Sequence, residues 1–118
     1  YMLKNDLRIN SSLAELISSI KNSEIYRNYE EVSREVGEVP GLQERIDEYR
    51  RNNFLIQQNH EGGELLQKLE DFELETAAFR SEPLVDKYLC AERDFVKLKQ
   101  DIDNRMLSEL EFSIPAGF

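Results

Sequence analysis

The feature that most constrains this chain is a run of apolar residues near its C-terminal end, spaced alternately four and three positions apart. A β-strand turns every second residue to the same side, so it cannot gather residues at these spacings on one face. A 4-3-4-3-4 spacing is instead typical of a helix packed in left-handed fashion on another helix. The pattern therefore predicts a long C-terminal helix with one apolar seam, formed by Leu84, Tyr88, Ala91, Phe95, Leu98 and Ile102.

The residues around the seam suggest where this helix begins and ends. Ser81 is expected to cap it, and Pro83 falls in the first turn, where the missing N–H of proline costs nothing. Beyond the seam the apolar positions change to another face of the helix, at Met106, Leu107 and Leu110. We expect the helix to continue there and to end before Pro115, which opens a tail to Phe118 that is flexible or docked on a partner.

The rest of the chain also favours helices. Apolar residues recur three and four positions apart almost throughout, and no run of alternating β-branched residues occurs. Breaks are expected at Gly37–Gly41, which contains Pro40, and at Gly62-Gly63. The sequence therefore predicts an all-α fold, a small bundle of four to five helices.

Capping residues and apolar stripes place the other helices. The first helix is expected to open at Asn10, Ser11 or Ser12 and to place Leu13, Leu16, Ile17 and Ile20 on one face. Ser23 offers a second cap, so one kinked helix or two short helices fit equally. A further helix is expected from about Pro40 to Gln58, followed by a short acidic helix. The apolar line of the former comprises Leu42, Ile46, Tyr49, Phe54 and Ile56.

The size of the chain suggests a single domain. Its 118 residues and 40% apolar content are enough for one modest core. We expect one domain over 1–118, with flexible ends at about 1–9 and 112–118. The sequence contains no long apolar run and no secretory signal layout, so we expect a cytoplasmic protein without a membrane contact.

The charge of the chain limits its partners. The net charge is −9, and Glu61 to Glu75 holds six acidic residues against Lys68 alone, a net −5. Such a field repels phosphate backbones and anionic lipids. Direct binding of nucleic acid is therefore not expected. The alternative is an RNA-associated subunit, which would bind nucleic acid through a local basic patch.

The few residues suited to chemistry are isolated. His60 is the single histidine and has Gln57 three residues before it, not the glutamate that a di-metal carboxylate bundle needs. Cys90 is the single cysteine, so no intrachain disulfide or cysteine cluster can form. His60 is expected to be a solvated loop residue rather than a catalytic base. Cys90 is expected to be a packing residue rather than a nucleophile. We expect no catalytic, cofactor or metal site.

The apolar seam then becomes the candidate functional feature. It can be an ordinary stripe packed within one chain, or it can pack against the same helix of a second subunit. A short chain gains stability by burying such a stripe between subunits, so we predict an oligomer seam at Leu84, Tyr88, Ala91, Phe95, Leu98 and Ile102. The alternatives to a helical protein that acts through contacts with partners are a purely structural oligomerisation module and a cryptic hydrolase or metal enzyme.

Three segments resemble the YlbF/YmcA/YheA family. Residues 82–95, followed by Asp101-Ile102, resemble its Asn-Pro-x-Val-x-x-(Tyr/Phe)-Leu-x-Ala-Glu-x-x-Phe stretch without gaps, with Glu82 in place of the usual Asn. Upstream, Ser23-x-x-Tyr26-x-x-Tyr29 is similar to the family's Ser-x-x-Tyr-x-x-Tyr helix, and Tyr49-Arg50 followed by Gln57 is similar to its Phe-Arg…Gln helix. The resemblance covers roughly Leu13 to Leu110.

The resemblance implies an all-α homodimer or higher oligomer that acts through partners. In bacilli and related bacteria it implies regulators of competence, sporulation and biofilm formation, which support RNA processing by a membrane-attached endoribonuclease. The implied partners are the chain itself, other family members and this ribonuclease complex, and the partners carry the chemistry. Some members carry cysteines that are associated with iron-sulfur clusters in that complex. This sequence has Cys90 alone and lacks a cysteine-rich tail.

Overall fold

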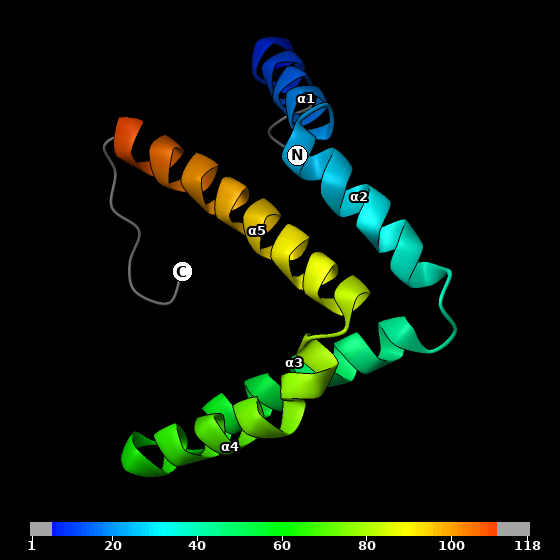
Figure 1. The fold of residues 1–118 in the computed structure, drawn as a ribbon. Helices are drawn as coiled ribbons and strands as arrows, with labels where there is room; N and C mark the ends of the chain where they lie inside the picture. Colours follow the sequence, from blue (N-terminus) through cyan, green and yellow to red (C-terminus); the bar gives the residue numbers. More distant parts are fainter. Residues whose placement is uncertain (1–5, 111–118) are drawn as a thin grey trace. The chain divides into compact units, whose positions relative to one another are not determined.

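The described residues form five helices and no strand (Figure 1). The computed structural model describes residues 6–110. The predicted all-α class and the long C-terminal helix are confirmed. None of the helices in the described range is long and apolar enough to cross a membrane. The helices are α1 (Leu7–Lys21), α2 (Glu24–Gly37), α3 (Leu42–Asn59), α4 (Gly62–Arg80) and α5 (Pro83–Glu109).

The chain divides into two compact units. The central unit comprises residues 30–90, and the terminal unit comprises, within the described range, residues 6–29 together with 91–110. Both boundaries fall inside helices, one in α2 and one in α5, rather than at the glycine and proline breaks. The single domain expected from the chain length stays a prediction.

The central unit has a small core built by three helices. Its buried apolar residues are Val32 and Val36 of α2, Leu42 and Ile46 of α3, and Val85 and Tyr88 of α5. Two ion pairs lie outside this core. Lys87 Nζ lies 3.5 Å from Glu35 Oε2, and Arg45 Nη2 lies 3.3 Å from Glu82 Oε1. All four side chains are substantially exposed, so the buried apolar residues contribute most of the stability.

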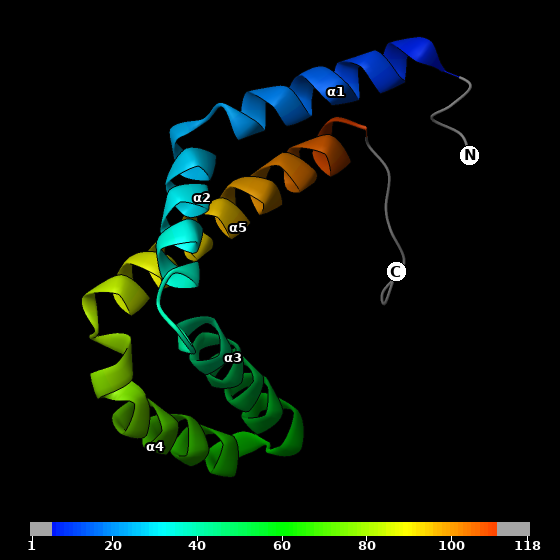
Figure 2. The same ribbon diagram turned by 90° about the vertical axis from the view of Figure 1, so that its right-hand side faces the viewer.

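Helices α3 and α4 form a hairpin within the central unit. They lie side by side in both views of the ribbon (Figures 1 and 2). Tyr49 of α3 stacks on Phe72 of α4 at 5.4 Å between ring centroids, and its ring lies 5.8 Å from that of Phe79. The Arg45 guanidinium lies 4.8 Å from the Phe79 ring centroid. Aromatic contacts of this kind add to the burial of apolar surface between the two helices.

The terminal unit is held by a cluster of aromatic rings. Tyr26 and Tyr29 lie one turn apart on α2, and both contact Phe95 of α5. The ring centroids are 5.3 Å apart for Tyr26 and Phe95, in an edge-to-face arrangement, and 5.2 Å apart for Tyr29 and Phe95, which are stacked. These are the preferred geometries of aromatic pairs.

The first helix starts earlier than the sequence suggested, whereas the second cap is confirmed. Asp6 caps α1, because its carboxylate accepts hydrogen bonds from the backbone N–H groups of Arg8 at 3.0 Å and Ile9 at 3.1 Å. The expected start at Asn10, Ser11 or Ser12 is therefore wrong. Ser23 does open a separate helix, since its hydroxyl accepts a hydrogen bond from the Tyr26 N–H at 3.2 Å. The structure thus has two short helices rather than one kinked helix.

Three further expectations need correction or restriction. Ser81 is the C-terminal cap of α4, where its N–H donates to the Ala77 carbonyl, and it does not open α5. Phe54 was expected in the apolar line of α3 but is 58% exposed. Helix α5 ends at Glu109, before Pro115 as predicted, and the expected tail to Phe118 lies outside the described residues.

Candidate interaction surface

Helix α1 carries an apolar face that the described structure covers only in part. No residue of α1 is buried. Because residues of a helix that are three and four positions apart share one side, the apolar residues of α1 form a stripe along one face. The stripe consists of Ile9, Leu13, Leu16, Ile17 and Ile20. All but Ile20 are exposed.

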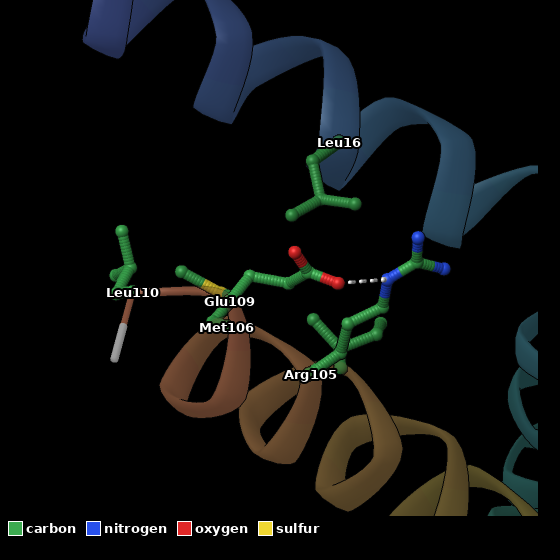
Figure 3. Close-up of a pocket in the computed structure, with 6 residues that line it drawn as sticks. Leu16, Arg105, Met106, Glu109 and Leu110 are labelled. Carbon is green, nitrogen blue, oxygen red and sulfur yellow. Dashed lines mark ion pairs between the residues drawn. The ribbon is translucent and has the colours of Figure 1, made fainter. Parts of the chain in front are cut away.

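The last turns of α5 lie opposite this stripe and form a groove with it. Two hollows of about 470 and 480 Å³ share Leu16 and Met106 as lining residues. Figure 3 shows Leu16 pointing from α1 toward the Glu109 and Arg105 side chains of α5. We call this feature the α1–α5 groove, and it lies within the terminal unit. Its lining residues are Arg8, Ile9, Ser12, Leu13, Leu16, Ile102, Arg105, Met106, Glu109 and Leu110.

The groove is lined by apolar side chains and by one ion pair. Met106 is 51% exposed and Leu110 is 64% exposed. Arg105 Nε lies 4.0 Å from Glu109 Oε1, and this weak, exposed ion pair lies between α5 and Leu16 of α1 (Figure 3). Exposed apolar side chains beside charged ones are typical of a protein interaction surface.

The six residues of the predicted seam have different environments. Tyr88 and Ala91 are buried within the chain, and Phe95 contacts the two tyrosines of α2. Leu84 and Leu98 are half-buried, and Ile102 lines the α1–α5 groove. The burial of Tyr88 and Ala91 favours packing within the chain at that part of the seam. The oligomer seam stays a prediction, and Ile102 is the seam residue that lines the groove.

Sequence reasoning identified the parts of the groove but did not combine them. The α1 stripe and the change of apolar face at Met106 and Leu110 were both visible as helical spacings. The spacing of a single helix does not reveal which other helix it faces, because that depends on contacts between distant segments. The signal available in the sequence is the apolar character of both stripes, which indicates that each packs against something but not against which segment.

The two residues considered for chemistry lie in separate environments. His60 is half-buried, and its Nδ1 lies 2.8 Å from Glu64 Oε1. The Cys90 thiol points at Asp86 Oδ1, 3.9 Å away. Among the described residues, the contacts of His60 and Cys90 do not bring the imidazole and the thiol together. Within the same residues no group of three or more His, Cys, Asp or Glu side chains is placed to hold a metal ion.

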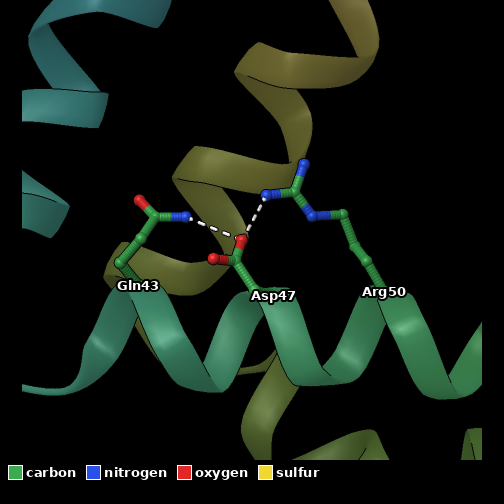
Figure 4. A network of polar contacts seen from close by, with 3 residues as sticks. All are labelled: Gln43, Asp47 and Arg50. Carbon is green, nitrogen blue, oxygen red and sulfur yellow. Dashed lines mark hydrogen bonds and ion pairs between the residues drawn. The ribbon is translucent and has the colours of Figure 1, made fainter.

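One carboxylate of the central unit is held in a polar network along α3. Asp47 Oδ1 accepts a hydrogen bond from Gln43 Nε2 at 3.0 Å and one from Arg50 Nη2 at 2.9 Å (Figure 4). The Gln43 hydrogen bond and the positive charges of Arg50 and Arg51 keep the pKa of Asp47 below its ordinary value. The network is exposed and involves neighbouring turns of one helix, so it stabilises α3 locally.

The comparison with protein families decides which group the chain belongs to. A family model described as control of competence regulator ComK, YlbF/YmcA, matches residues 9–111 of the 118. The chain belongs to the YlbF/YmcA family. The match contains every residue that lines the groove except Arg8.

Membership of the YlbF/YmcA family makes this a chain of a regulatory family. Two of the three segments that resembled the family meet in the structure, since Tyr26 and Tyr29 pack on Phe95. Neither the comparison with curated proteins nor that with solved structures finds a match. The family description names the control of a competence regulator and no substrate, cofactor or partner.

Proposed function

We propose that the protein is a non-enzymatic, cytoplasmic regulatory adaptor that acts through protein–protein contacts and pairs with a second copy of itself. The observation that carries this proposal is the α1–α5 groove, because two helices present apolar residues there that the described part of the chain covers only in part. The interface would include Leu98 and Ile102, the partly exposed end of the predicted seam. The regulatory description of the family supports the same role.

The groove offers enough apolar surface to make association favourable. Complete burial of a leucine or methionine side chain contributes roughly 1.5–3 kcal/mol. In a two-fold dimer each such residue is buried twice, once in each subunit. Part of this gain offsets the loss of translational and rotational freedom on association. Leu16 and Met106, which line both hollows, are therefore expected to dominate the interface.

The chemistry of the regulated process is proposed to lie with the partners. The family resemblance implies support of a ribonuclease complex in RNA processing, which requires no catalytic group in this chain. His60 contacts Glu64 and Cys90 contacts Asp86, so these contacts do not pair the imidazole with the thiol, which supports assigning the two residues no joint catalytic part. The net charge of −9 supports a role in which the protein contacts the ribonuclease complex and does not bind RNA directly.

Light scattering at micromolar concentration tests the proposal through matched variants of α1 and α5. Leu16→Asp and Met106→Asp place a charge in the groove and are each expected to shift the protein toward monomer. Leu7→Asp is the control, because Leu7 is 79% exposed, does not line the groove and adds the same charge to the same helix. Circular dichroism verifies that all three variants keep their helix content.

Two results would contradict the proposal. One is a wild-type protein that is monomeric at these concentrations, and the other is a Leu7→Asp effect equal to that of Leu16→Asp. A second experiment addresses the adaptor role: affinity purification from the native cell is expected to recover a ribonuclease complex with the wild type. Salt-sensitive binding of RNA by the isolated protein would favour the RNA-associated subunit instead.

A further inference from the structure

Helix α4 carries two different apolar rows. The inner row is half-buried and includes Phe72 and Phe79, which contact Tyr49 of α3. The outer row is exposed, with Leu66 at 65% and Leu74 at 78% exposure. At about 100° per residue the two leucines lie within about 80° of each other around the helix, so they share a side. Ala77 and Ala78 extend this side, and both are exposed.

The outer side of α4 is also strongly acidic. Glu70 lies one turn from each exposed leucine, and Asp71 and Glu73 flank it. Within residues 6–110 no ion pair joins these three carboxylates to a basic side chain. Arg80, which is close in sequence, donates its guanidinium N–H groups to the Glu73 carbonyl and the Thr76 hydroxyl. The outer side thus combines exposed leucines with uncompensated negative charge.

These two properties define the chemistry of a partner. Exposed leucines at helical spacing accept the apolar face of another helix, which is a common mode of peptide recognition. The carboxylates require that the partner carry lysine or arginine beside its apolar residues. A second copy of this chain that used the same face would bring the acidic residues of the two α4 helices together, and like charges oppose that arrangement.

We propose that the outer side of α4, defined by Leu66, Glu70, Glu73 and Leu74, docks a basic amphipathic helix of a partner protein. The proposal rests on the adaptor function, because it names the kind of partner that such an adaptor holds. It uses a surface separate in sequence and in residues from the α1–α5 groove. One molecule could therefore self-associate through the groove and bind its partner through α4.

A model peptide tests this site directly. The probe is a fluorescein-labelled amphipathic helix of about 18 residues, five helical turns, with leucine on one side and lysine on the other. We expect it to bind the full chain with an affinity that falls as salt concentration rises. The same peptide with glutamate in place of lysine is expected not to bind.

Variants of α4 assign the binding to its outer side. The double variants Leu66→Ser/Leu74→Ser and Glu70→Gln/Glu73→Gln are each expected to weaken peptide binding about tenfold or more. The matched control is Glu30→Gln/Glu31→Gln, which removes two exposed carboxylates from α2 and is expected to leave binding nearly unchanged. Circular dichroism on the same samples verifies folding.

Three outcomes would overturn the proposal. The first is equal weakening by the α2 control, which would indicate attraction to the net charge alone. The second is unchanged binding by the leucine variant. The third is a loss of self-association in the leucine variant, which would assign the outer side of α4 to a second copy. Light scattering on every variant separates failure of this site from failure of the groove, since the two proposals concern different residues.

Discussion

Ser33 lies on α2 between Val32 and Val36, two buried residues of the central unit. Its hydroxyl oxygen is buried and has no hydrogen-bond partner within the described part of the chain. A buried hydroxyl without a partner lowers stability, because folding removes its hydrogen bonds to water and does not replace them. Serine is also a weaker helix former than alanine.

Ser33→Ala is therefore expected to raise the free energy of unfolding by about 1 kcal/mol. Urea denaturation followed by circular dichroism measures the change. Ser19→Ala, at an exposed position of α1, is the control and reports the gain from helix propensity alone, about 0.5 kcal/mol. A gain at Ser33 no larger than that at Ser19 would mean that the Ser33 hydroxyl is hydrated or otherwise satisfied.

The pKa of Asp47 gives a second prediction at the residue scale. Gln43→Ala removes the hydrogen bond that contributes most to the lowered pKa, so the pKa of Asp47 is expected to rise toward its ordinary value. Because the folded-state pKa is lowered, the stabilisation is present above the ordinary aspartate pKa of about 3.9 and is lost as the pH falls through the folded-state value. Titration of the side-chain carboxyl by NMR measures the pKa.

Gln67→Ala is the control for this titration. Gln67 donates to Asp71 at 3.0 Å with the same four-residue separation, but on α4. Its removal is expected to leave the Asp47 pKa unchanged. If both variants shifted the Asp47 titration alike, the shift would come from a general change in helix stability.

At the scale of elements, glycine and proline allowed accurate prediction of where helices stop. The breaks at Gly37–Gly41, at Gly62 and before Pro83 all separate helices in the structure. Capping was predicted less well, since serine serves both ends of a helix and Ser81 caps α4 at its C-terminal end. Asp6 was missed for a related reason: Asn10, Ser11 and Ser12 are equally good capping residues, and residue type alone does not choose among them.

The connection between α2 and α3 offers a test of backbone strain. Gly41 has a φ of 77°, a left-handed conformation that side chains with a Cβ atom rarely adopt, and nothing lies within 4 Å of a Cβ added there. Gly41→Ala is therefore expected to lower the free energy of unfolding by about 1 kcal/mol through backbone strain alone.

Gly37 provides the matched substitution. It ends α2, it also has open space around an added Cβ, and its φ is not positive. Gly37→Ala is expected to raise stability by roughly 0.4–1 kcal/mol, because it reduces the freedom of the unfolded chain. If urea denaturation gives changes of opposite sign in the free energy of unfolding for the two variants, backbone conformation, and not space, determines the need for glycine at position 41.

At the scale of the molecule, family and fold class followed from the sequence, whereas the division into units did not. Helical spacing is a local property, and residues 82–95 carried both the C-terminal helix and the family resemblance. The unit boundaries fall within α2 and α5, where no change of spacing or composition marks them. Which stripes are covered depends on contacts between distant segments. The groove could therefore not be predicted from periodicity.

The net charge of −9 determines how salt should act on self-association. Two copies repel each other, and salt screens this repulsion over about 10 Å at 0.1 M ionic strength. Raising sodium chloride from low to moderate concentration is therefore expected to strengthen self-association, measured by sedimentation equilibrium. The lysine-rich peptide on α4 is expected to respond in the opposite sense. Self-association that weakens with salt would indicate attractive charge pairs at the interface.

The aromatic clusters make the two units spectroscopically separable. The protein has no tryptophan, and the described tyrosines are divided evenly: Tyr26 and Tyr29 in the terminal unit, Tyr49 and Tyr88 in the central unit. Each contacts or is buried among other residues of the fold, so its signal depends on folding. Fluorine-labelled tyrosine would thus give one NMR reporter per position, and the melting of either unit could be followed in a single unmodified sequence.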